Sequence, residues 1–405
     1  MAACKHTGSR PVVYPRVEIP ENRVGQYATE YLEAFNSGDD EEIRTFAQKH
    51  RTKSYLEKRS LEDITRWYNI VHERTGGLSP VKIAHLTESE IVVTCQSDKS
   101  GGLVLMSFSI DKNDPPYLVS RNIDLLGPSV ALDSIHIDEE LIDNTISSVA
   151  AVLRQQYVYP DKGEEIASAL EEYHSNGRYK GITDGIVLAR KVGTDLRAIG
   201  KDKHLGLQYG CPPENEEVSI RIDKEAAAAN YGFRKVDVLP NNIGYIEFDR
   251  FYHSDEAMEV AVEALEKVSD CDAVIFDIRH NQGGSPEMVG LIASYFFNTP
   301  TQLGSRYSRI HDEKLREFYS FEEVPGKRFD ESVPVYVLVS DVTGSAAEVF
   351  ANCLQELKRA TVVGETTGGA AHTVIQSAVN DHFWMNIPYG RAMGPISKED
   401  WEGVG

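Results

Sequence analysis

The order of hydrophobic and polar positions changes twice along the chain, first near residue 90 and again near residue 138. Before the first change, apolar residues recur three and four positions apart, which predicts amphipathic helices. After it they alternate with polar residues, which predicts half-buried strands. The predicted elements are helices at 27–35, about 40–49 and 60–74, and strands at 90–95 and 103–110. Helices followed by strands predict an α+β accessory domain over residues 23–130.

The first predicted helix ends in a strong stop signal, Phe35-Asn36-Ser37-Gly38-Asp39. This ending, with the order of elements, resembles the cone-shaped, nuclear transport factor two-like fold. The resemblance implies a domain that binds a small molecule or mediates dimers. We favour a purely structural accessory domain, because no convergent polar residues are visible and a fold alone does not define a function. Residues 1–22 are polar, carry three prolines, and are predicted to form a flexible lead-in.

Beyond residue 138 the pattern is first helical and then alternates between strand and helix. Amphipathic helix continues to about residue 198, with breaks such as Tyr159-Pro160-Asp161, and predicts a helical subdomain over 138–215. Short apolar runs then alternate with helical stretches over 216–405. The expected strands are 243–248, 273–278, 333–339 and 361–363, and the expected helices are 256–268, 287–297 and 349–357. This alternation predicts an α/β core with a largely parallel sheet, in which sites form at strand ends.

Composition excludes some classes of partner. Lys and Arg number 42 and Asp and Glu 63, a net charge of −21 that repels phosphate backbones and argues against nucleic acid. No run of 18 apolar residues predicts a transmembrane span, and no apolar signal-peptide region precedes residue 10. Met1-Ala2-Ala3-Cys4 resembles the end of a lipoprotein cleavage site, which makes Cys4 a candidate lipidation site. The five scattered cysteines suggest buried free thiols, with no zinc spacing or disulfide framework.

Three segments at predicted strand ends carry candidate chemistry. The first strand leads into Gly283 and Gly284, whose amides can approach a ligand closely. The second leads into Ser345 at a helix N-terminus, where free amides and the helix dipole can stabilise an oxyanion. The third leads into the glycine-rich residues 364–369. Taken alone, Ser345 is more simply explained as a helix N-cap, and the glycine pair as an ordinary loop.

In this order the three segments resemble the motifs of the tail-specific, or carboxy-terminal processing, serine peptidases. The segments are Asp277-Ile278-Arg279-His280-Asn281-Gln282-Gly283-Gly284, Ser345-Ala346-Ala347-Glu348 and Gly364-Glu365-Thr366-Thr367-Gly368-Gly369. The resemblance covers roughly residues 138–405 and implies a crotonase-like α/β core with a helical N-terminal subdomain. It implies that Ser345 is the nucleophile. The oxyanion hole would be formed by the amides of Ala346 and of Gly283 or Gly284.

Two features separate this chain from the tail-specific members of that family. Those members have a lysine base directly after the third motif, where this chain has Ala370. Lys358 is the only lysine shortly upstream and aligns with nothing catalytic, so a Ser–Lys dyad is excluded. Those members also carry a PDZ module after the helical subdomain, and the short link between Tyr209 and Val218 leaves no room for one. Another group must therefore take the proton from Ser345.

A second branch of the family, which includes the tricorn core protease and, in outline, the interphotoreceptor retinoid-binding protein repeats, uses a Ser–His–Glu arrangement. Its histidine lies in a Gly-x-x-His segment, which residues 199–206 resemble, and its glutamate in a Glu-x-Gly-Val pattern, which residues 401–404 resemble. The resemblance implies that His204 is the general base and Glu402 the supporting carboxylate. His372, near the position of the missing lysine, is the alternative base.

The sequence therefore supports two functions of different kinds. The first is a serine peptidase that acts on a peptide or protein. The alternative is a catalytically weak protein that binds an apolar ligand in a cleft lined by Phe350, Phe383, Trp384 and Tyr389. Neither function implies a metal or an organic cofactor. The oligomeric state is left open, with a homo-oligomer among the arrangements we allow for.

Overall fold

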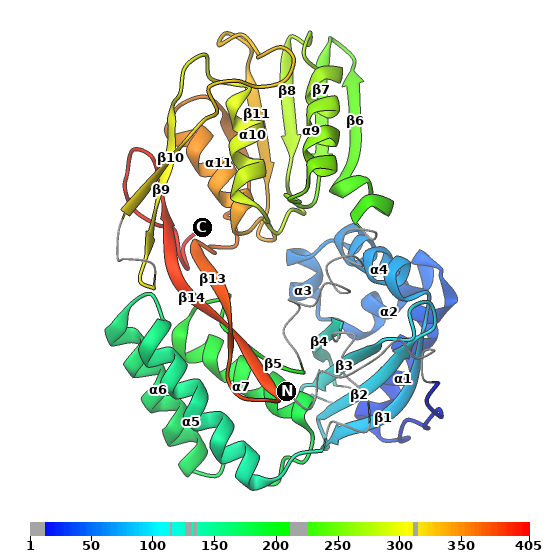
Figure 1. Ribbon diagram of the computed structural model, residues 1–405. Coiled ribbons are helices and arrows are strands. Elements are labelled where there is room, and N and C mark those ends of the chain that lie inside the picture. The colour runs from blue at the N-terminus through cyan, green and yellow to red at the C-terminus, as the bar shows by residue number, and fades with distance from the viewer. Residues whose placement is uncertain (1–12, 114–115, 126–131, 133–135, 211–225, 311–314) are drawn as a thin grey trace.

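Figure 1 shows three structural parts: an N-terminal domain, a parallel-sheet layer with its helices, and a lower part where three helices flank an antiparallel sheet. The computed structural model describes residues 13–113, 116–125, 132, 136–210, 226–310 and 315–405. The candidate lipidation site Cys4 and the link at 211–225, with Cys211, lie outside these residues. The other three cysteines, Cys95, Cys271 and Cys353, are buried free thiols, as the sequence predicted.

The N-terminal domain packs four helices against a four-stranded antiparallel sheet, which confirms the predicted order of helices and strands. Its elements are α1 (Arg23–Ser37), α2 (Asp40–His50), α3 (Lys53–Lys58), α4 (Leu61–Thr75), β1 (Leu78–Leu86), β2 (Glu90–Ser97), β3 (Leu103–Ile110) and β4 (Leu118–Leu125). Capping side chains explain the helix starts, because Asn22, Asp39 and Ser60 accept hydrogen bonds from first-turn amides. The lead-in also touches this domain, since the Val17 amide donates to the Pro80 carbonyl at 2.9 Å.

The lower part joins the helical segment to the end of the chain. Helices α5 (Glu139–Gln156), α6 (Pro160–Ser175) and α7 (Gly185–Gly200) share one hydrophobic core with strand β14 (Phe383–Met393). Strand β5 (Gly206–Tyr209) also pairs with β14, so the boundary expected at residue 215 crosses a continuous packing unit. The remaining strands of this sheet are β9 (Gln302–Ser308), β10 (Leu315–Tyr319) and β13 (His372–Ala378).

The upper part is the predicted α/β layer. Its sheet has the order β12-β11-β8-β7-β6, in which all neighbours except β6 and β7 are parallel, so the largely parallel sheet is confirmed. The strands are β6 (Phe233–Leu239), β7 (Ile243–Phe248), β8 (Ala273–Asp277), β11 (Val335–Val339) and β12 (Thr361–Gly364). The helices are α9 (Asp255–Lys267), α10 (Pro286–Ser294) and α11 (Ala346–Glu356). Assignment to crotonase-like and nuclear transport factor two-like folds stays a prediction.

Candidate active site

Ser345 occupies a sharp turn between β11 and α11. Its backbone has φ 53° and ψ −122°, whereas an ordinary N-cap residue lies in the extended region. A positive φ is costly for a residue with a side chain and is held only where the surroundings enforce it. A strained strand-to-helix turn is one known way to present a serine hydroxyl for attack. Ser345 does form a capping box with Glu348 at this helix start, but a cap alone does not account for the positive φ.

The glycine pair after β8 packs directly against this turn. A methyl group at Gly283 would lie 2.7 Å from Cβ of Ser345 and 2.8 Å from the amide nitrogen of Ala346, so only glycine fits. Gly283 donates its own amide to Oδ1 of the buried Asn281 at 2.8 Å. Of the two candidate glycine donors for an oxyanion hole, this arrangement favours Gly284.

A buried carboxylate ties the serine turn to the loop that follows β12. Glu348, only 2% exposed, accepts hydrogen bonds from the amides of Ser345 and Ala370 at 2.8 Å each. It also accepts from the Gly369 amide and the Thr367 hydroxyl, both at 2.7 Å. Four donors satisfy the charge without a cationic partner. Ala370, at the position where the tail-specific peptidases are expected to have lysine, thus contacts the carboxylate that holds the Ser345 turn.

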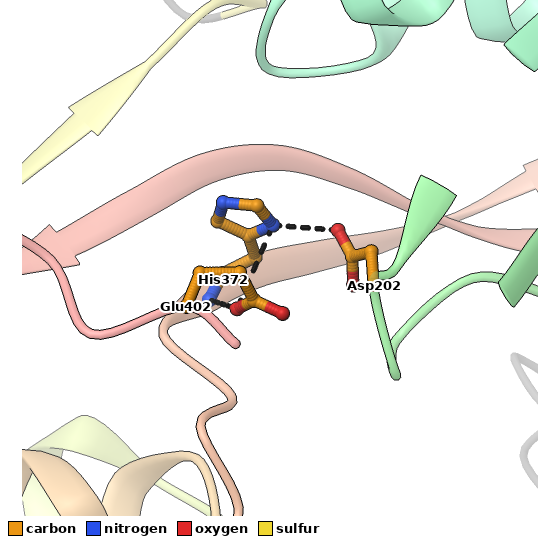
Figure 2. A group of neighbouring side chains, drawn as sticks. All are labelled: Asp202, His372 and Glu402. Carbon is orange, nitrogen blue, oxygen red and sulfur yellow. Dashed lines mark hydrogen bonds and ion pairs between the residues drawn. The ribbon is translucent and has the colours of Figure 1, made fainter. Parts of the chain in front are cut away.

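The same loop leads into a cluster of ionisable side chains, drawn in Figure 2. Nδ1 of His372, at the start of β13, lies 2.6 Å from Oδ2 of Asp202 and 3.7 Å from Oε2 of Glu402. Glu402 also accepts from the amides of Ala371 and His372, at 2.7 and 3.1 Å. The side chains of His372 and Asp202 are 2% and 1% exposed, and that of Glu402 is 12% exposed. The two carboxylates therefore share one buried site.

His204 approaches this cluster from the other side of Asp202. Its amide donates to Oδ1 of Asp202 at 2.9 Å, and its Nδ1 lies 3.7 Å from the same oxygen. The side chain is 16% exposed, while Nδ1 is buried without a hydrogen-bond partner. The accessible part of the ring thus lies away from Nδ1. By contrast, Nε2 of His372 is buried and has no hydrogen-bond partner.

Charge and burial act against each other in the cluster. Burial alone would raise the pKa of Asp202, but hydrogen bonds from His204 and His372 outweigh it and hold that pKa well below its usual value. Burial would lower the pKa of His372, but the hydrogen bond and charge of Asp202 outweigh it and raise that pKa. Burial and the neighbouring Asp202 raise the pKa of Glu402. Asp202 is therefore the carboxylate that carries the negative charge between two imidazoles.

Three of these side chains could also hold a metal ion. One ligand atom each from Asp202, His372 and Glu402 lies within 4.8 Å of the others, and imidazole with carboxylates suits several divalent cations. However, the Nδ1 that faces the carboxylates is already hydrogen-bonded to Asp202. Nε2 of His372 and Oε1 of Glu402, by contrast, are buried without a hydrogen-bond partner.

The structure brings most of the predicted residues together. His204, His372 and Glu402 lie in one cluster, and Ser345 lies on the other side of the loop at 364–371, which contacts both. Gly403 donates to the Gly369 carbonyl at 2.9 Å, which places the C-terminal turn beside this loop. No hydrogen bond joins Ser345 to either histidine within the described residues.

Asp202 was missed by the sequence reasoning, although it lies two residues before His204 in the segment that was singled out. The signal available was the Asp-x-His spacing, because an aspartate often accepts a hydrogen bond from the amide two residues on. Two of the four residues proposed to line an apolar cleft lie in different hydrophobic cores. Phe350 belongs to the core of the parallel sheet, and Phe383 to the separate core of the helical part.

Comparisons with known proteins agree with this picture. The sequence profile described as "Peptidase family S41" matches residues 242–404, and that of the "N-terminal domain of Peptidase_S41 in eukaryotic IRBP" matches residues 133–238. Together the two profiles cover about two thirds of the chain. Residues N-terminal to 133, which include the accessory domain, lie outside both matches.

The curated relatives are processing proteases. The carboxy-terminal processing protease CtpB of Bacillus subtilis is 24% identical over 279 residues, covering 60% of this chain and 56% of the relative. A carboxyl-terminal-processing protease of Synechocystis is 32% identical over 194 residues, covering 44% of this chain and 43% of the relative. The chain thus spans about half the length of such relatives. Among solved structures, the photosystem II D1 C-terminal processing protease matches with a TM-score of 0.41 and 16% identity, covering 66% of this chain and 92% of that one.

In the described part of the chain, no helix is both long and apolar enough to cross a membrane.

Proposed function

Because the chain belongs to peptidase family S41, we propose that it is a serine peptidase that hydrolyses peptide bonds through an acyl-enzyme on Ser345. The observation that carries this proposal is the conformation of Ser345, with positive φ at a helix N-terminus and a glycine packed against it. A serine that only capped the helix would not need this strain. The substrate is a peptide or protein, and the oxyanion of the tetrahedral intermediate is held by the amides of Ala346 and Gly284.

His204 is the general base in this proposal, and Asp202 orients it. Nδ1 of His204 faces the Asp202 carboxylate, so the accessible edge of the ring is left to take the proton from the Ser345 hydroxyl. Glu402 and His372 support Asp202 from the buried side. This arrangement and Ala370 support our proposal that the chain is nearer the Ser–His–Glu branch of the family than the Ser–Lys branch.

The proton moves twice in each half of the reaction. Ser345 attacks the peptide carbonyl as His204 accepts its proton, and His204 then donates that proton to the departing amine. A water molecule next gives a proton to His204 and attacks the acyl-enzyme, and the proton returns to Ser345.

Labelling with a fluorophosphonate tests the nucleophile. Wild-type protein should be labelled with one probe per chain, and Ser345→Ala should not be labelled, because only an activated serine reacts readily. Peptide mapping identifies the labelled residue. Labelling of the Ser345→Ala variant to the same extent would refute the assignment.

The two candidate bases are separated by a matched pair of variants. We expect His204→Ala to lower the rate of labelling by about 10²–10⁴-fold, as the loss of a general base does. His372→Ala should lower it less, because its ring is buried and supports Asp202. Circular dichroism controls for folding. If the His204→Ala protein reacts at the wild-type rate and His372→Ala does not, His372 is the base.

A further inference from the structure

A cavity lies beside the nucleophile turn at the C-terminal ends of three parallel strands. It has a volume of about 320 Å³ and is walled by the residues that follow β8, β11 and β12. These walls include Arg279 and His280, which precede the glycine pair, and residues 339–342, which precede Ser345. Ligands in open α/β sheets bind at this edge. The cavity therefore adjoins the position that we assign to the scissile bond.

The N-terminal domain forms the remaining wall. Arg59, which follows α3, and Asp63, in the first turn of α4, both line the cavity. Arg59 lies 3.8 Å from Asp341 across the boundary, and Asp63 lies 3.8 Å from His280. The two domains meet here through these two long contacts, and the side chains of Arg59 and Asp63 stay 44% and 43% exposed. Oδ2 of Asp63 accepts from the Ser60 hydroxyl at 2.6 Å, which leaves Oδ1 of Asp63 and the Arg59 guanidinium to contact a third group.

The lining carries an excess of negative charge. Asp63, Asp341 and Glu365 contribute carboxylates. Arg279 is neutralised by Asp277, with which it makes two hydrogen bonds of 2.9 and 2.6 Å.

Burial, with a smaller contribution from Arg66, lowers the pKa of His280, so that its ring is neutral near pH 7. Among the described residues that line the cavity, Arg59 is then the one cation that faces the three carboxylates without a bidentate partner.

The geometry points to a substrate subsite in this cavity, walled by the N-terminal domain, that takes a cationic side chain, lysine or arginine, of the peptide. This inference rests on the proposed function for its substrate, and it gives the N-terminal domain a part in substrate selection. Asp63 and Arg59 are its specificity-determining residues. A bound ammonium or guanidinium group would pair with the carboxylates and compete with Arg59 for Asp341.

Peptide binding to the Ser345→Ala variant tests the subsite without any catalytic step. A fluorescent glutamine-rich peptide is compared with versions that carry lysine at each position in turn, and affinity is measured by anisotropy. At one position lysine should tighten binding. In that peptide, Asp63→Asn should weaken binding about two- to fivefold and Arg59→Gln should strengthen it by a similar factor, as expected for exposed charges. Binding of the all-glutamine peptide should change with neither variant.

Glu62→Gln is the matched control, because it removes the same charge from the neighbouring residue, which is exposed and does not line the cavity. It should leave lysine-peptide affinity unchanged. The inference is overturned if lysine tightens binding at no position, if the two variants shift affinity in the same direction, or if no peptide binds. Fluorophosphonate labelling of wild-type Ser345 is measured in parallel, so that failure of the subsite and failure of the proposed peptidase are told apart.

Discussion

Ser345 combines a strained backbone with a dense set of compensating contacts. A non-glycine residue at φ 53° costs about 1–3 kcal/mol, and the cost persists only where neighbours enforce it. Here Glu348 binds the Ser345 amide, and Gly283 approaches so closely that no side chain fits between them. These contacts hold the backbone of Ser345 in place without a ligand, which is the preorganisation that the proposed nucleophile would need.

Asp202 shows how one residue can organise a site through its neighbours. It binds the hydroxyl of Tyr157 at 3.0 Å, the ring of His372 and the amide of His204. Oδ1 of Asp202 contacts His204, and Oδ2 contacts His372. A change in the protonation of either histidine therefore alters the charge seen by the other. This coupling links the stability of the site to pH.

The stability of the folded protein should depend on pH through His372. Asp202 raises the pKa of this histidine, so the folded protein holds the imidazole proton more tightly than the unfolded chain. That stabilisation is complete below the ordinary histidine pKa of about 6.5 and is lost as pH rises through the folded-state value. The excess free energy of unfolding of wild type over His372→Gln should therefore shrink with rising pH.

Urea unfolding of both proteins between about pH 6 and pH 9 measures this difference. His174→Gln is the control, because His174 also pairs with a carboxylate, Asp143 at 2.8 Å, but on the exposed surface. Its difference from wild type should vary little with pH. A wild-type advantage over His372→Gln that stayed constant or grew with pH would contradict the pairing with Asp202.

At the scale of elements, helix α11 and the loop after β12 behave as one unit through Glu348. The carboxylate lies in the first turn of the helix, where the dipole favours negative charge, and its four donors come from both segments. The amides of Gly369 and Ala370 thereby fix the loop that leads to His372. Ser345 and the histidine cluster are thus positioned by a shared structural support.

Replacing Glu348 by Gln should weaken both stability and reactivity. Gln replaces one accepting oxygen of Glu348 with an NH₂ group, which cannot accept hydrogen bonds from the amides that face it. We therefore expect a loss of about 1.5–3 kcal/mol in the free energy of unfolding. Labelling of Ser345 should also slow, because the turn and the loop lose their common partner. Denaturant unfolding and the labelling rate are measured on the same samples.

Glu356→Gln provides the comparison on the same helix. Glu356 also anchors a distant loop, accepting from the amides of Ile396 and Ser397 at 2.7 and 3.1 Å, but it has no contact with the Ser345 turn. This variant should lose stability and keep its labelling rate. Equal loss of labelling in the two variants would mean that Glu348 acts on folding alone.

Local patterns predicted the parallel layer well and the antiparallel sheet poorly. Strands β7 and β8 are short apolar runs, each followed by a helix, and such runs can be recognised in the sequence. Strands β9 and β10 mix charged and small residues, and β14 pairs with β5 and β9, which lie far away in the chain. These two pairings of β14 depend on contacts that no local window contains.

The candidate site follows the same rule. Ser345 and the glycine pair were found because each lies in a recognisable strand-end motif, whereas Asp202 acquires its role only when β13 brings His372 beside it.

Helix α10 ends at Ser294, before the predicted residue 297. The last residues of the predicted helix instead make single-turn hydrogen bonds, from Tyr295 to Ile292 and from Phe296 to Ala293, as helix ends often do.

At the scale of the whole molecule, the N-terminal domain contacts both other parts. Arg66 on α4 pairs with Glu247 on β7, and Arg190 on α7 pairs with Glu90 on β2 at 3.0 Å. A small hydrophobic cluster also crosses the boundary between the N-terminal sheet and α7, with members Val81, Val92, Leu103, Leu105, Ile186 and Val187. Figure 1 shows the domain beside both the parallel layer and the helical part. A domain held on two sides should unfold together with its neighbours.

Lys82→Met tests whether this boundary makes unfolding cooperative. Lys82 Nζ lies 2.6 Å from Oδ2 of Asp184, whose side chain is 6% exposed and caps α7. Removing the lysine leaves a buried charge with only its capping amides, so we expect a loss of about 1–3 kcal/mol. Because the domains share this contact, calorimetry should show one transition in wild type that moves to lower temperature as a whole in the variant. Lys53→Met, a change at a 92% exposed lysine of the same domain, should leave the transition in place. Two separate transitions in wild type would mean that the N-terminal domain folds independently of the rest of the chain. The interface that holds Arg59 and Asp63 against the cavity would then be weak.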